Sequence, residues 1–224
     1  MSGPEHSIDG ANGSGHSAVF VVVVALSAGG LKPLKCLVRG LSRGCPAAIV
    51  VAQHVRGITL LPEVLHHHTS MPVLFARRGT VLRAGCIYVC PAEQHVIVNP
   101  DAALSVSSRD RVRFFRPSAD WLFESAAASF RERAFAIVLS GSQNDGSRGT
   151  IAVTRAGGSV IAQAPETCDF PQMPAAAIAA GSVQYILKPD EMALTLQALM
   201  ERIDVVGHLS EWENPFGEVE ATGT

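Results

Sequence analysis

Three stretches of this chain are apolar over the full length of a β-strand, and each ends at a polar or glycine-containing loop. They cover residues 19–26, 47–52 and 134–139. Segments with apolar residues at helical spacing separate them. A strand that is apolar on both faces is typical of a parallel sheet covered on both sides. We therefore predict an α/β fold with a doubly wound, mainly parallel sheet, helices on both of its faces, and a small β-hairpin region in the middle.

Periodicity and end signals predict the other elements. Ser118 is placed to cap a helix up to residue 130, and Pro174 to open an alanine-rich helix. The further expected helices are 31–41, 60–68, 149–156 and 191–203, and the further expected strands are 73–76, 86–90, 96–98, 159–163 and 183–187.

The composition predicts one domain between two tails. With 224 residues, 47% hydrophobic and 17% charged, the chain can bury one sizeable core. Residues 1–17 are rich in Gly, Ser and His, and residues 206–224 are acidic, so we expect flexible tails there and a domain over 18–205. The longest apolar stretch, 18–26, is too short to span a membrane, and no signal sequence precedes it. We expect a cytoplasmic protein without membrane insertion, and a net charge of −2 gives no general attraction to nucleic acid.

The cysteines do not form a metal-site or disulfide pattern. There are five, an odd number, on apolar or loop segments, so reduced thiols are expected. Cys86 and Cys90 flank an expected strand, and no second pair of cysteines completes a zinc site. The sequence predicts no metal and no cofactor.

Three residues that could form a catalytic triad follow the ends of apolar strands. Ser27 follows the first, His54 the second and Asp145 the third, after a short loop. Loops at the carboxyl ends of parallel strands gather at one edge of the sheet. A histidine can activate a serine hydroxyl, and a carboxylate can orient the histidine. The order Ser, His, Asp and the lack of G-x-S-x-G argue against the common α/β-hydrolase class.

Neighbouring residues could support this chemistry. The turn after Ser27 offers free backbone N–H groups that could stabilise an oxyanion. The residues expected in the oxyanion hole or close behind the triad are Ala28, Gly29, Gly30, Gln53, His95, Ser142 and Asn144. For His95, a plain surface role is equally compatible with the sequence.

Several motifs in register resemble the CheB family of protein-glutamate methylesterases. They are Leu26-Ser27-Ala28-Gly29-Gly30, Ala52-Gln53-His54, Gly85-Cys86-Ile87-Tyr88-Val89-Cys90-Pro91 followed by His95, Pro117-Ser118-Ala119-Asp120, Asn144-Asp145-Gly146, and two further segments at 157–163 and 173–181. The resemblance covers about residues 18–200. It implies hydrolysis of glutamate methyl esters on chemoreceptor helices in chemotaxis-type adaptation, with Ser27 as nucleophile, His54 as general base and Asp145 as its orienting partner. Members often also deamidate receptor glutamines.

Two departures from the family pattern lead to further expectations. Only 17 residues precede the first strand, whereas members usually carry an N-terminal receiver domain. We expect activity without phosphorylation, and any regulation to come from a response regulator or signalling partner in trans. The family's Gly-Met-Gly is Gly141-Ser142-Gln143 here, so strain is expected if Gln143 must adopt a positive φ.

Two other functions and one surface feature stay open at this point. A glycine turn after the first strand suits a dinucleotide, but G-x-G-x-x-G is absent. A catalytically weak adaptor of the same fold is the second alternative. Two arginine-rich stretches could contact an acidic receptor helix or be solvated faces: Arg77, Arg78 and Arg83, and Arg109, Arg111, Arg113 and Arg116.

Overall fold

The computed structural model describes residues 17–210, and it contains a seven-stranded sheet in which every pair of neighbouring strands is parallel. The strand order is β3-β4-β2-β1-β7-β8-β9. These strands are β1 (Phe20–Leu26), β2 (Ala47–Gln53), β3 (Val73–Phe75), β4 (Ile87–Val89), β7 (Ala134–Val138), β8 (Ser159–Gln163) and β9 (Tyr185–Leu187). The antiparallel pair β5 (His95–Val98) and β6 (Leu104–Ser107) forms a separate hairpin.

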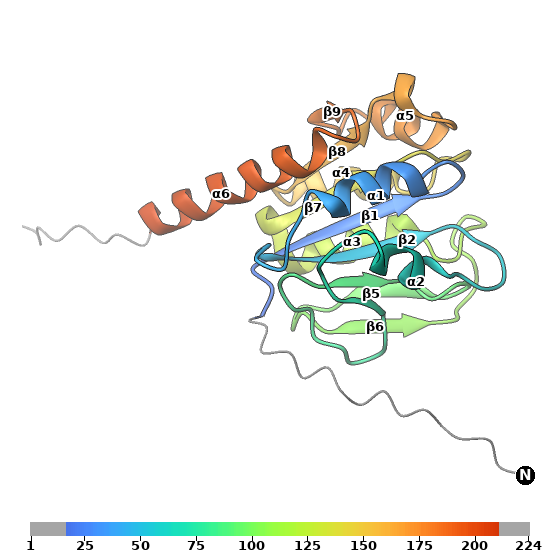
Figure 1. Cartoon of the computed structure of the whole chain (residues 1–224), viewed down its shortest axis with the longest axis horizontal. Helices are drawn as coiled ribbons and strands as arrows, with labels where there is room; N and C mark the ends of the chain where they lie inside the picture. Colours follow the sequence, from blue (N-terminus) through green and yellow to red (C-terminus); the bar gives the residue numbers. More distant parts are fainter. Residues whose placement is uncertain (1–16, 211–224) are drawn as a thin grey trace, which may run out of the picture.

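Helices cover both faces of the sheet (Figure 1). The helices are α1 (Leu31–Arg39), α2 (Leu61–His66), α3 (Ala119–Phe130), α4 (Ser147–Arg155), α5 (Gln172–Ala179) and α6 (Met192–Ser210). Helices α1, α2 and α6 pack on one face, while α3, α4, α5 and the β5–β6 hairpin pack on the other. In Figure 1, α1 and α2 lie nearer the viewer than the strands, and α3 and α4 lie behind them.

The central strands fill two cores because their successive side chains point to opposite faces. In β1, Val22 and Val24 join the core under α1, whereas Val21 and Val23 join the core under α3. All seven β1 residues are buried, which explains why the strand is apolar throughout rather than alternating.

The register brings three strand ends to one edge of the sheet. Leu26 of β1 pairs with Gln53 of β2, and Ala25 pairs with Val138 of β7. The chain continues from β1 to β2 on one side, while β7 lies on the other side, so the topology switches direction beside β1. Crevices of open α/β sheets lie outside such a switch point.

The predicted fold class is confirmed. Strand β6 was not among the strands expected from the sequence, and the other differences described here concern the ends of elements. Pro174 is the third residue of α5 rather than its first. Helix α6 runs on to Ser210, past the domain limit expected at residue 205. The tails expected at 1–17 and 206–224 otherwise lie almost entirely outside the described residues. Within residues 17–210, no helix combines the length and the apolar character needed to cross a membrane.

Candidate active site

Ser27 lies at the carboxyl end of β1, in a turn that only glycine can complete. Gly29 has a φ of +74°, and a Cβ on it would lie 2.7 Å from Ser140 Oγ and 2.8 Å from Asp169 Cβ. The Gly30 N–H donates to the Ser27 carbonyl at 3.1 Å, so it is not available to a substrate oxygen. Within residues 17–210, no acceptor is found for the N–H groups of Ala28 and Gly29, so both can donate to a bound ligand.

Ser140 holds this turn against β7, a role that the sequence analysis missed. Its carbonyl accepts the Ser27 N–H at 3.0 Å, and its hydroxyl lies 2.9 Å from the Ala28 carbonyl and accepts the Phe170 N–H at 3.1 Å. Its own N–H donates to the side-chain oxygen of Gln163 at 2.9 Å. Ser140 is fully buried. In the sequence, the one sign of its role is that a serine directly follows an apolar strand.

His54 and Asp145, 91 positions apart in the chain, are joined by a hydrogen bond between their side chains. The distance from His54 Nε2 to Asp145 Oδ2 is 2.8 Å. Asp145 is buried, while the His54 side chain keeps 13% of its surface exposed. Because Nε2 faces the carboxylate, Nδ1 is the ring nitrogen left to accept a proton from a nucleophile.

The amino terminus of α3 fixes Asp145. Its Oδ2 accepts the Ala119 N–H at 2.6 Å, and its Oδ1 accepts the N–H groups of Asp120 at 3.1 Å and Gly146 at 3.0 Å. The Ser118 hydroxyl lies 3.4 Å from Oδ1. First-turn N–H groups of a helix have no partner within the helix, so a carboxylate placed there is both satisfied and held.

A second carboxylate repeats this arrangement one helix further on. Asp120 Oδ1 accepts the N–H groups of Arg148 at 3.1 Å and Gly149 at 2.9 Å, at the start of α4. Burial raises the pKa of Asp120, although these hydrogen bonds oppose the rise. The predicted cap at Ser118 is present, with its hydroxyl accepting the Trp121 N–H at 3.4 Å. The capping residue of α3 therefore lies next to Asp145.

His95 lies behind the site and outside the cleft. It is fully buried, its Nδ1 accepts the Ser118 N–H at 3.2 Å, and its Nε2 lies 3.1 Å from the Asp110 carbonyl. This pattern requires the neutral ring with its proton on Nε2. Burial lowers the pKa of His95, and the nearby Arg116 charge lowers it further. Its ring also packs on Trp121, with centroids 4.9 Å apart.

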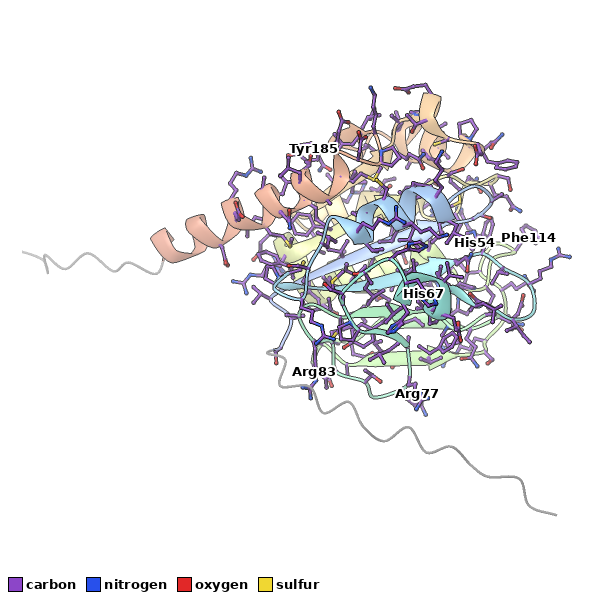
Figure 2. All side chains as sticks on the ribbon, viewed as in Figure 1. His54, His67, Arg77, Arg83, Phe114 and Tyr185 are labelled. Atoms are coloured by element: carbon purple, nitrogen blue, oxygen red, sulfur yellow. The ribbon has the colours of Figure 1, made fainter. Side chains whose placement is uncertain are left out.

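Ser27 and His54 share one cleft of about 200 Å³. Its other lining residues are Val55, Arg56, Glu93, Arg111, Phe114, Phe115, Arg116 and Gln143. The His54 ring stacks on Phe115 with centroids 5.0 Å apart. Among the hydrogen bonds of residues 17–210, none joins the Ser27 hydroxyl to His54. Figure 2 places His54 and Phe114 at the right-hand end of the molecule, toward which β1 points.

The other predicted residues take varied places. Gln53 accepts a hydrogen bond from the Thr59 hydroxyl at 2.9 Å and so holds the loop after His54. Ser142 is exposed, and so is Asn144, whose carbonyl accepts the Ser147 hydroxyl at 2.8 Å. Neither residue is among those lining the cleft.

The strain expected at Gln143 is absent, and that prediction is wrong. Gln143 does not have a positive φ; in this loop Gly146 does, with φ +94°. Gly141 is the residue with no space for a side chain, because a Cβ there would collide with Met173 and lie 3.0 Å from Ser27 Cβ. Gln143 is exposed and lines the cleft.

The sequence matches one protein family over most of the chain. A sequence model of the family "CheB methylesterase" matches residues 22–196. FrzG of Myxococcus xanthus, a protein-glutamate methylesterase, is 33% identical over 187 residues, which are 83% of this chain and 55% of FrzG. A protein-glutamate methylesterase/protein-glutamine glutaminase of Anaeromyxobacter dehalogenans is 36% identical over 185 residues, 81% of this chain and 54% of that protein.

A shorter relative and a solved structure agree with these two. A Leptospira interrogans protein, provisionally named as having the same two activities, is 30% identical over 77% of this chain and 90% of its own length. The crystal structure of the Thermotoga maritima CheB methylesterase catalytic domain superposes with a TM-score of 0.78 at 28% identity, covering 82% of this chain and all of that domain.

The fold and these matches all point to one family of ester-hydrolysing enzymes. The chain belongs to the CheB methylesterase family. It spans about half the length of FrzG and of the Anaeromyxobacter relative. Family membership also removes the dinucleotide-binding alternative.

Proposed function

We propose that this chain hydrolyses glutamate methyl esters on chemoreceptor helices, with Ser27 as nucleophile, His54 as general base and Asp145 as the group that orients His54. The observation that carries the proposal is the 2.8 Å contact between His54 and a buried Asp145, in a cleft that Ser27 also lines. The names of the relatives support the substrate class.

The proposed reaction has two steps through an acyl-enzyme. Ser27 Oγ attacks the ester carbonyl carbon while its proton passes to His54 Nδ1, and a C–O bond forms. The tetrahedral intermediate then collapses, His54 returns the proton to the leaving oxygen, and methanol departs. In the second step a water molecule repeats the attack with His54 as base, which releases the glutamate and restores Ser27.

Two parts of the cleft must act together for this chemistry. The Ala28 and Gly29 N–H groups are the proposed donors to the oxyanion, since the described residues leave them without an acceptor. The Ser27 hydroxyl must approach His54 when substrate binds, a change common between free and substrate-bound active sites. Ser142 and Asn144 do not line the cleft, so we assign them no direct part in these steps.

Methanol release from a methylated receptor fragment tests the proposal. The wild-type chain should release methanol, and Ser27→Ala and His54→Ala should each lower the rate about a thousandfold or more with the fold intact. The double variant should be no worse than either single one, because the residues act as a unit. A much slower double variant would contradict the triad. Ammonia release from the unmodified receptor would test glutamine deamidation in the same site.

The methanol-release assay also distinguishes this function from an adaptor role, and it tests whether activity requires a phosphorylated partner. An adaptor would bind receptor without releasing methanol. The cytoplasmic location and the response-regulator partner expected from the sequence belong to this proposal. Activity of the purified chain without a phosphorylated partner is expected, and activity only after its addition would contradict that expectation.

A further inference from the structure

Phe114 is an exposed aromatic residue at the mouth of the catalytic cleft. It is 88% exposed, more than any other large hydrophobic side chain in residues 17–210. It lines the same cleft as Ser27 and His54, and its neighbour Phe115 stacks on His54. Aromatic residues are the commonest binding anchors, and their exposure to water is unfavourable when nothing covers them.

A tight hairpin turn presents Phe114 in this position. Val112 and Phe115 exchange two backbone hydrogen bonds, of 3.0 and 2.9 Å. The two residues between them, Arg113 and Phe114, have φ of 49° and 78°. Positive φ at both central positions is the pattern of a type I′ turn, which favours Asn and Gly. Phenylalanine is therefore a poor choice for the turn itself, and a role outside the turn explains it better.

Ion pairs hold the hairpin against the rest of the cleft. Arg111 lies 2.6 Å and Arg116 lies 3.3 Å from the Glu93 carboxylate. Arg111 also donates to the Phe114 carbonyl at 3.3 Å. Phe114 is thus carried on a braced segment rather than on a free loop, so little ordering is needed when a partner binds.

The size of the cleft limits what can enter it. One turn of an α-helix, about 10 Å across and 5.4 Å long, occupies roughly 400 Å³. The cleft holds about 200 Å³. A single ester-bearing side chain can therefore reach Ser27, while the helix that carries it must lie across the mouth, where Phe114 stands.

The charge at the mouth favours an acidic helix. Arg56 lines the cleft, and Arg113 precedes Phe114 in the turn. Both are exposed, and neither has an ion-pair partner within 4 Å among the described residues, although the charge of Arg113 opposes the rise in the pKa of Asp120 and Glu124. A helix with several glutamates available for methylation is acidic wherever those glutamates are unmodified. The stretch with Arg77, Arg78 and Arg83 lies elsewhere: Figure 2 places Arg77 and Arg83 on the lower side of the molecule, away from His54.

We propose that Phe114 is the specificity-determining anchor for the receptor: its ring packs on the apolar side of an acidic amphipathic helix, while Arg56 and Arg113 contact the unmethylated glutamates of that helix. This inference rests on the proposed function and names how that site selects a helical substrate. The geometry matches helix recognition in which one apolar contact sets the register and surrounding charges set the orientation.

The variant Phe114→Gly tests the anchor without damaging the turn. Glycine suits a positive φ, so the turn should be kept or stabilised while the ring is lost. We expect KM for a methylated receptor fragment to rise about tenfold, and the ratio of kcat/KM for receptor to kcat/KM for a small glutamate methyl ester to fall by the same factor. Phe114→Leu should recover part of the loss. Leu194→Ala, which shortens an exposed side chain on α6, is the matched control and should behave as wild type.

The charged part is tested by Arg56→Gln with Arg113→Gln. This variant should raise KM for receptor and flatten its increase with salt, because exposed charges act through screened attraction. Arg202→Gln on α6 is the control. The proposal is overturned if Phe114→Gly leaves the receptor-to-ester ratio unchanged, or lowers both activities equally. Failure of the proposed function is a different result: the wild-type chain would then hydrolyse neither the receptor ester nor the small ester.

Discussion

Replacing Asp145 with asparagine changes one atom and places a donor where an acceptor is needed. Asp145 Oδ2 accepts hydrogen bonds from Ala119 N–H and His54 Nε2, at 2.6 and 2.8 Å. An amide NH₂ in that place can accept neither. Turning the amide over moves the conflict to Oδ1, which accepts from Asp120 and Gly146. Either orientation loses at least one hydrogen bond to a charged group, a cost of about 1.5–3 kcal/mol.

The larger effect of Asp145→Asn is on the tautomer of His54. With an NH₂ group facing it, Nε2 must accept, and the ring proton moves to Nδ1. That is the nitrogen proposed to take the proton from Ser27, so the base is blocked while the geometry is retained. We expect kcat to fall about 10⁴-fold, the loss that the corresponding change causes in a serine protease triad. Asp145→Ala leaves the tautomer free but also removes the acceptors of the Ala119 and Asp120 N–H groups at the start of α3, so it should destabilise the fold more than Asp145→Asn does.

Two measurements separate these effects. Methanol release gives kcat, and guanidinium unfolding gives the free energy of unfolding for both variants. We expect Asp145→Asn to be the less active and the more stable of the two. The reasoning about the tautomer is refuted if Asp145→Asn keeps more than about a tenth of wild-type kcat, a loss of under 1.4 kcal/mol in activation free energy.

Three further predictions concern the residues around the triad. Because burial lowers the pKa of His95 from 6.5, the unfolded chain binds the proton more readily. The free energy of unfolding should thus fall as the pH drops below about 6.5, by up to about 1.4 kcal/mol per pH unit, and His95→Gln should remove this component in unfolding at pH 7.5 and 5.5. Gly141→Ala puts a Cβ 2.8 Å from Met173 Cγ and should cost about 1–3 kcal/mol and lower activity. Gly44→Ala is the control, because the added Cβ would lie near only Ser42 Oγ, at 3.6 Å. Equal unfolding midpoints for the Gly141 and Gly44 variants would contradict the packing argument. Asp120→Asn keeps an oxygen for the α4 N–H groups and removes a buried charge, so thermal unfolding should show little change, whereas Asp120→Ala should cost about 1 kcal/mol.

The sheet and the positions of Ser27, His54 and Asp145 at its carboxyl edge were predictable because each depends on local sequence. An apolar stretch of strand length can hardly lie anywhere except in a covered sheet, and the residue after it then falls at the carboxyl edge. Parallel pairing of β1 with both β2 and β7 aligns those edges. Ser27 and His54 follow directly. The Ser118 cap was readable for the same reason, since capping needs only a serine before a helical pattern.

Contacts between distant segments were not predictable from these patterns. Ser140 connects the Ser27 turn to Phe170, which lies 30 positions after Ser140 in the chain. The spacing of apolar residues does not predict such a hydrogen bond. The hairpin around Phe114 was hidden because its central residues are not those that a positive φ favours. Strand β6, four residues long with half-buried serines, lacks the apolar run that marks the other strands.

The loop between Gly141 and Gly146 shows why the family likeness led to the wrong residue there. A glycine replaced by glutamine suggests strain only if the glycine was needed for its φ, and the backbone at Gln143 has no positive φ. Gly141 is needed for space instead, because the Met173 side chain and the Cβ of Ser27 approach it. The exposed side of the loop can therefore vary while its buried side cannot. Gln143 then lies on the cleft wall facing solvent, where a substitution changes what the substrate meets rather than how Asp145 is held.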